Sequence, residues 1–192
     1  MSDAPPLTVF LDASVLYPAS IRNLLLYIAG ARLYRPLWSA KVHEEWIAAL
    51  LRNRPDLNRQ QLDRTRALME AHVINAEVTG YEFLIDTLTL PDPNDRHVLA
   101  AAIHGGASII VTANLRHFPA EKLAPHGLTA QHPDSFVFEL MTSDLGAVLA
   151  VMRDHRLSLV NPPKTAEDYL ATLERHHMTA TAAALRAVID RL

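Results

Sequence analysis

One acidic residue directly follows an apolar segment near the start of the chain. Thr8 to Leu11 is β-branched and apolar, which predicts a short strand buried on both faces, and Asp12 comes next. Ligands of open α/β sheets bind beyond the carboxyl ends of the strands, so Asp12 is placed to meet one. The alternative is that Asp12 only caps the turn that follows, through Ser14 or Val15.

A second candidate is Glu45. Val42, Glu45, Trp46 and Ala49 have the i, i+3, i+4, i+7 spacing of a buried helical stripe, which turns Glu45 inward and Glu44 outward. A carboxylate on an apolar face is costly unless it is paired or bound to a cation. Glu45 is therefore a candidate ligand, with an arginine partner at the edge of the stripe as the alternative.

The same helical spacing recurs at Asp95, Val98, Leu99 and Ala102. Asp95 is thus expected on a packing face. Asp92 before Pro93 is a strong helix start, so capping is the favoured role of Asp92 and accounts for part of Asp95 as well.

Polar residues also follow the apolar run Ser108 to Thr112, which is the clearest strand in the sequence. Asn114 can accept a hydrogen bond from a metal-bound water or bind a cation weakly through its carbonyl oxygen. Arg116 and His117 are candidate phosphate contacts, as is Arg22. By itself the segment is an ordinary turn, and its position beside Asp12 gives it weight.

The donor types predict the cofactor and the reaction. Oxygen ligands come from separate elements, the chain has no cysteine, and its ten histidines lack the paired spacing of a zinc site. This set favours Mg²⁺ or Mn²⁺, as one or two ions, over Zn²⁺. In a phosphodiesterase, such ions activate a water and neutralise the charge on the leaving oxygen.

The elements that must position these residues alternate between strand and helix, which predicts an α/β fold: an open parallel sheet flanked by helices. Strands are expected at 8–11, 34–38, 73–78 and 108–112, with helix as the alternative for 73–78. Helices are expected at 21–31, from Ser39 to about Asn53, from Asn58 to about His72, and from Asp92 to about His104. Further helices are expected at 135–142 and 145–153, with two more between Thr165 and Leu192.

Length and composition bound the remaining possibilities. The 192 residues allow one nuclease domain over 1–143 and a helical extension over 144–192 that packs on it. We find neither a targeting segment nor a membrane span, and expect a cytoplasmic location. The net charge of -3 requires nucleic acid to meet a local basic patch. The arginine-rich stretch either provides that patch or is a solvated helix surface; its members are Arg52, Arg54, Arg59, Arg64 and Arg66.

Four segments together resemble the PIN-domain family and, within it, the VapC-like toxins of bacterial toxin-antitoxin pairs. Val9 to Leu16 resembles the first strand with its metal-binding Asp12. Ser39 to Glu45 resembles the Ser-x-x-x-x-x-Glu element, Asp95 to Ala102 the Asp-x-x-(Ile/Val)-Leu-Ala-x-Ala segment, and Ile109 to Phe118 the last motif. The likeness spans about Leu7 to Phe136.

This resemblance implies a metal-dependent endoribonuclease in which Asp12, Glu45 and Asp95 bind the metal, joined by Asp92. Asn114 and His117 stand where many members place an acid, which leaves a four-acid site in doubt and makes Asn114 a residue that positions water. Ser14 would contact the substrate. The resemblance also implies an RNA substrate, a small antitoxin and a homodimer. Two alternatives are a PIN-like module that has lost catalysis and only binds RNA or protein, and a phosphatase of the haloacid-dehalogenase type. The latter usually needs an acid where Ser14 stands.

Overall fold

The fold is built on a four-stranded sheet. The computed structural model describes residues 7–192, and its strands are β1 (Thr8–Leu11), β2 (Arg35–Leu37), β3 (Ile109–Val111) and β4 (Thr129–Gln131). Their order is β2-β1-β3-β4 and every pairing is parallel. The predicted α/β fold with an open parallel sheet is therefore confirmed.

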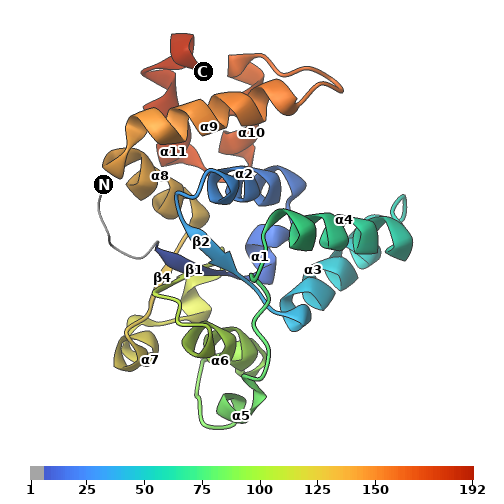
Figure 1. Cartoon of the computed structure of the whole chain (residues 1–192), viewed down its shortest axis with the longest axis vertical. Helices are drawn as coiled ribbons and strands as arrows, with labels where there is room; N and C mark the ends of the chain where they lie inside the picture. Colours follow the sequence, from blue (N-terminus) through green and yellow to red (C-terminus); the bar gives the residue numbers. More distant parts are fainter. Residues whose placement is uncertain (1–6) are drawn as a thin grey trace.

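The two central strands are buried because helices cover both faces of the sheet. Val9, Phe10 and Leu11 of β1 are fully buried. The helix α2 (Ala19–Gly30) lies on one face, and α6 (Arg96–His104) lies on the other (Figure 1). This double cover explains why β1 and β3 are continuous apolar runs rather than alternating ones.

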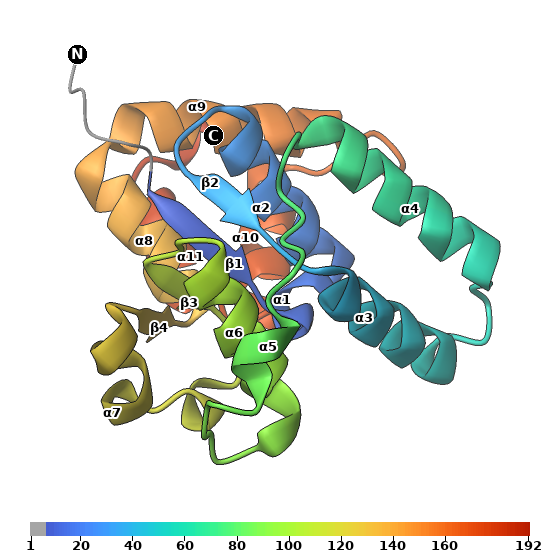
Figure 2. The same ribbon diagram turned by 60° about the horizontal axis from the view of Figure 1, so that its bottom comes forward.

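The two helices that follow β2 begin at the residues that the sequence indicates, whereas the helix expected from Ile21 begins two residues earlier and the short helix directly after β1 was not predicted. After the short helix α1 (Ala13–Leu16) and α2, Ser39 caps α3 (Ala40–Asn53). Asn58 caps α4 (Arg59–His72) with a capping box completed by Gln61. Figure 2 shows α3 and α4 side by side.

The last third of the chain, from Pro133 onward, is helical, as predicted. Its helices are α8 (Pro133–Ser143), α9 (Leu145–Ser158), α10 (Ala166–Arg175) and α11 (Thr179–Arg186). They pack on one another, and α9 and α10 also contact α2, on the side of the sheet opposite α6 (Figure 1). The extension therefore shares the α2 side of the core, and the domain boundary at residue 143 stays a prediction.

The remaining elements are short. The helices α5 (Glu82–Ile85) and α7 (Ala120–Leu123) lie on the α6 side of the sheet, and there are four 3₁₀ turns. These turns are η1 (Pro93–Asp95), η2 (Leu115–His117), η3 (Ala124–His126) and η4 (Ile189–Arg191).

Two strand assignments need correction. Residues 73–78 form neither strand nor helix: Asn75 has a positive φ of 61°, and only an isolated bridge joins Glu77 to Trp38. The fourth strand is instead β4, which the sequence analysis missed. This strand has three residues, all exposed or partly exposed, so it lacks the apolar run that marks β1 and β3.

Within residues 7–192, no helix has the length and apolar character needed to cross a membrane. The expectation that the chain lacks a targeting segment concerns its first residues, and residues 1–6 lie outside those described.

Candidate metal centre

Asp12 lies at the carboxyl end of β1 and is held by four protein groups. Its backbone N–H donates to the carbonyl of Val111 at the end of β3. Its Oδ1 accepts from the N–H of Ala13 at 2.7 Å, so Asp12 does cap α1. Its Oδ2 accepts from Ser14 Oγ at 2.6 Å and from Thr112 Oγ1 at 2.8 Å. Capping and a site role are therefore compatible, since each carboxylate oxygen has two lone pairs.

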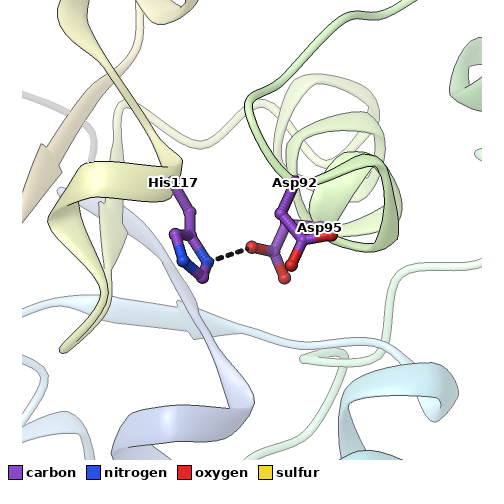
Figure 3. A group of neighbouring side chains, drawn as sticks. All are labelled: Asp92, Asp95 and His117. Carbon is purple, nitrogen blue, oxygen red and sulfur yellow. Dashed lines mark hydrogen bonds and ion pairs between the residues drawn. The ribbon is translucent and has the colours of Figure 1, made fainter.

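A second group of side chains gathers where α6 begins. Asp92, Asp95 and His117 each place a potential ligand atom within 4.8 Å of the others (Figure 3). Asp92 caps η1 by accepting from Asn94 N–H at 2.9 Å, which confirms the predicted helix start. Asp95 Oδ2 lies 2.7 Å from His117 Nδ1. All three side chains are partly buried, so they remain open to solvent on one side.

The raised pKa of Asp95 links this group to Asp12. Burial raises the pKa of Asp95, and the negative charges of Asp12 and Asp92 raise it further, while the hydrogen bond from His117 lowers it. Asp12 therefore lies close enough for like-charge repulsion to reach Asp95. A carboxylate made more basic by neighbouring carboxylates is a position where a cation is stabilising.

Glu45 contacts His97, a histidine in the segment that carries Asp95. His97, two residues after Asp95, is buried, and its Nε2 lies 2.8 Å from Glu45 Oε1. The contact is short but falls outside hydrogen-bond geometry. Glu44 instead forms ion pairs with Arg59 and Arg66 on α4. The two neighbouring glutamates thus face different partners, and Glu45 pairs with a histidine rather than with the arginine considered as its alternative partner.

These donors fit a divalent cation. Asp92 and Asp95 supply carboxylate oxygens and His117 supplies one imidazole nitrogen, and hard cations are bound chiefly by such oxygens. Asp12 retains a lone pair on Oδ1, and Glu45 is about one-third exposed (34%). Among the described residues, the structure brings Asp92, Asp95 and His117 within range of one ion, whereas Asp12 and Glu45 are not in that group, so their role as ligands stays a prediction.

The residues after β3 are placed partly as expected. Asn114 is exposed, and its backbone N–H donates to Thr112 Oγ1 at 3.0 Å. Arg116 is also exposed, and its Nε donates to His117 Nε2 at 3.2 Å. Beside them is an open hollow of about 390 Å³, lined by Pro91, Asp92, Pro93, Arg116 and His117. This hollow lies next to the Asp92–Asp95–His117 group.

Ser14 and Arg22 were expected to contact the substrate. In the structure both side chains are instead engaged with other groups of the protein. Ser14 Oγ donates to Asp12 and accepts from the N–H of Ala113, so its hydrogen is already used. Arg22 is only 7% exposed, donates to the carbonyl of Leu16 at 2.7 Å and lies over the ring of Trp46. Desolvation lowers its pKa to about 10. The proposed phosphate contact of Arg22 is corrected accordingly, because its charge is engaged inside the fold.

The arginine-rich stretch is less cationic than its sequence indicates. Arg54 pairs with Asp56 and Arg59 with Glu44 and Asp63, while Arg66 contacts several glutamates of α3, α4 and the following loop. These acids neutralise much of the local charge. A basic patch for nucleic acid is therefore weaker here than expected.

Two residues of the site were missed from sequence. His97 lies inside the segment around Asp95, but it falls off the apolar stripe used to find inward residues. Thr112 ends the β3 segment, and its hydroxyl bonds Asp12 across 100 positions of the chain. The available signal for Thr112 was a hydroxyl residue at the carboxyl end of a strand beside Asp12.

Comparison with known proteins identifies the family. A PIN domain family model matches residues 8–116, more than half of the chain, so the chain belongs to the PIN-domain family. Membership of this family excludes the alternative that the chain is a phosphatase of the haloacid-dehalogenase type.

Within that family, the chain resembles VapC proteins. A model of the VapC50 C-terminal domain matches residues 133–187. Over 94 residues the chain is 40% identical to the "Putative ribonuclease VapC50" of Mycobacterium tuberculosis (strain ATCC 25618 / H37Rv). That alignment covers 49% of this chain and 55% of the relative, so the chain spans about half the length of the curated relative it matches. No solved structure gave a significant match.

Proposed function

We propose that this chain is an endoribonuclease that hydrolyses RNA phosphodiester bonds with Mg²⁺ or Mn²⁺. The observation that carries the proposal is the Asp92–Asp95–His117 group, whose potential ligand atoms lie within 4.8 Å of one another at the start of α6. Carboxylates that repel one another in a partly buried site are costly to the fold, and a bound cation removes that cost. The name of the M. tuberculosis relative supports the choice of RNA as the substrate.

Each residue of the site has a defined task in this proposal. A bound divalent ion supplies the polarised water and the charge that stabilises the leaving oxygen. Asp12, Glu45, Asp92 and Asp95 hold the ion, with Asp12 braced by the hydroxyls of Ser14 and Thr112.

Around this ion site, exposed groups from the end of β3 meet the substrate. Arg116 and His117 line the hollow in which a phosphate would lie, so Arg116 is positioned to pair with it. Asn114, exposed beside them, is assigned to orient water.

The adjacent glutamates of α3 give a matched test. Glu45→Gln is expected to lower Mn²⁺-dependent cleavage of single-stranded RNA by on the order of 100-fold or more, because the amide loses the charge that a cation requires. Glu44→Gln has the same chemistry one position away, where the side chain faces Arg59, and should cleave within about twofold of the parent chain. Cleavage would be followed with a fluorescent RNA, a DNA strand of the same sequence, and EDTA as the metal-free control. Equal cleavage by the two variants would contradict the proposal.

A PIN-like module without catalysis is the remaining alternative, favoured by Asn114 and His117 at positions where many family members carry an acid. Calorimetric titration with Mn²⁺ separates the cases. A chain that binds RNA, binds no Mn²⁺ and leaves RNA intact would be such a module.

The partner assignments belong to the same proposal. A VapC-like toxin is held inactive by a small antitoxin and acts in the cytoplasm, and we propose both for this chain, together with a homodimer. Co-expression with the product of the adjacent reading frame, followed by size-exclusion chromatography with light scattering, tests the complex and the dimer together.

A further inference from the structure

The Asp92–Asp95–His117 cluster contains one donor that an all-carboxylate magnesium site does not have. We propose that His117 binds the cation directly through Nδ1 and thereby makes the site prefer Mn²⁺ over Mg²⁺. This inference rests on the proposed function, since it concerns the ion that the nuclease site would hold. It replaces the phosphate contact first expected of His117.

The spacing of the donor atoms matches a shared ion. Ligands about 2.1 Å from one octahedral ion lie roughly 3 Å apart when adjacent and about 4.2 Å apart when opposite. His117 Nδ1 and Asp95 Oδ2 are 2.7 Å apart, and no two of the three donors are more than 4.8 Å apart. Shifts of a few tenths of an ångström therefore complete the set. In Figure 3 the imidazole and both carboxylates point toward one another.

The backbone holds His117 in this position before any ion binds. The residue ends the turn η2, where its N–H donates to the carbonyl of Asn114 at 2.9 Å. Phe118, which follows it, is 3% exposed and belongs to the hydrophobic core. A side chain fixed between a turn and a buried anchor loses little conformational freedom on binding an ion.

The hydrogen bonds around the imidazole are compatible with a ligand role. Arg116 Nε donates to His117 Nε2, so the neutral ring carries its hydrogen on Nδ1 and donates it to Asp95. A cation takes the place of that hydrogen between Nδ1 and Asp95, and the ring hydrogen moves to Nε2. Arg116 is exposed, so it turns away into solvent at little cost.

One imidazole changes the selectivity of the set. Mg²⁺ demands near-ideal octahedral oxygen coordination, whereas imidazole suits first-row transition ions better. The remaining donors are carboxylates, which suit Mn²⁺ as well as Mg²⁺. A mixed set therefore disfavours Mg²⁺ without creating the cysteine- or histidine-rich set of a zinc site.

Pulsed electron paramagnetic resonance of bound Mn²⁺ tests the ligand directly. We expect a ¹⁴N modulation from an imidazole in the parent chain, and its loss in His117→Asp, which supplies an oxygen ligand instead. Calorimetric titration of each protein with Mn²⁺ and Mg²⁺ should show the ratio of the two affinities falling by on the order of tenfold in His117→Asp. His126→Asp, an exposed residue of η3, is the matched control and should keep both the modulation and the ratio.

The outcomes separate this inference from the proposed function. RNA cleavage by a parent chain whose bound Mn²⁺ shows no nitrogen modulation would overturn the His117 role and leave the nuclease intact. Modulation that persists in His117→Asp would assign the nitrogen to another histidine, such as His97, and would also overturn it. Absence of Mn²⁺ binding would overturn both the His117 ligand role and the metal dependence of the proposed nuclease. A nitrogen-coupled Mn²⁺ in a chain that leaves RNA intact would support the ligand and contradict the nuclease. If His117→Asp fails to fold, absence of nitrogen modulation in the parent chain still overturns the His117 role, and loss of the modulation in His97→Asn would overturn it as well.

Discussion

At the level of single residues, the Thr112 hydroxyl links the carboxyl ends of β1 and β3 by hydrogen bonds. Its side chain is fully buried, its Oγ1 donates to Asp12 Oδ2 at 2.8 Å, and the same oxygen accepts from Asn114 N–H at 3.0 Å. The hydroxyl therefore fixes the orientation of the Asp12 carboxylate and the start of the loop that carries His117. In a metal site, groups that orient the ligands are often as sensitive as the ligands themselves.

Thr112→Val removes this hydroxyl while keeping the shape of the side chain. We expect Mn²⁺ affinity to fall by about tenfold. We also expect the free energy of unfolding to fall by about 1–3 kcal/mol, because the Asn114 N–H loses its partner and the Asp12 carboxylate oxygen loses one of its two donors. Calorimetry and urea denaturation measure the two effects. Thr112→Ser should restore most of the affinity, and failure of the serine variant to do so would show that the hydroxyl is not what matters.

At the level of elements, the C-terminal helices are tied to α8 by one buried carboxylate. Asp134 is 7% exposed and accepts from the backbone N–H groups of Ala180 and Thr181, both at 2.8 Å. These donors lie in the first turn of α11, where backbone N–H groups have no partner within the helix. The carboxylate also meets the positive end of that helix dipole, so it both caps α11 and positions it.

Asp134→Ala is expected to cost about 3 kcal/mol of unfolding free energy, since two hydrogen bonds to a charged group are lost and the buried N–H of Thr181 is left without a partner. Hydrogen exchange at Ala180 and Thr181 should accelerate, whereas Mn²⁺ affinity should stay unchanged. Glu139→Ala, at an exposed position of the same helix, serves as the control. Unchanged exchange at α11 in Asp134→Ala would contradict the capping role.

For the whole molecule, the extension and the sheet domain meet around a buried histidine. His155 of α9 is 2% exposed and lies between the rings of Tyr27 on α2 and Tyr169 on α10. Its Nδ1 lies 2.9 Å from the Tyr169 hydroxyl. Burial lowers the pKa of His155 from 6.5 to about 4. The histidine is therefore neutral in the folded protein across a range of pH in which the unfolded chain takes up a proton.

This difference makes the fold sensitive to acid. Between pH 6.5 and pH 4 the unfolded state binds more protons at this residue, so stability is lost as the pH falls through that window. The loss from His155 alone is about 2 kcal/mol at pH 5 and about 3 kcal/mol at pH 4. His155→Asn should flatten the pH dependence of the unfolding free energy by these amounts, and His126→Asn, at an exposed position, should not. Parallel curves for the parent chain and His155→Asn would contradict this assignment.

The sequence by itself determined the features that depend on neighbours along the chain. The apolar runs of β1 and β3, the caps at Ser39 and Asn58, and the cap of η1 at Asp92 all follow from local spacing and side-chain chemistry. The helical period was also enough to send Glu45 and Glu44 to different partners, because residues one apart on a helix face different directions.

Only the tertiary structure decided what depends on contacts between distant segments. β4 is a strand because β3 offers it a partner, as its own three residues carry little strand signal. Arg22 became a buried structural cation. Thr112, His97 and His117 became partners of Asp12, Glu45 and Asp95, through contacts that span 100, 52 and 22 positions of the chain. Such pairings follow from how the elements pack, and local propensity carries no information about them.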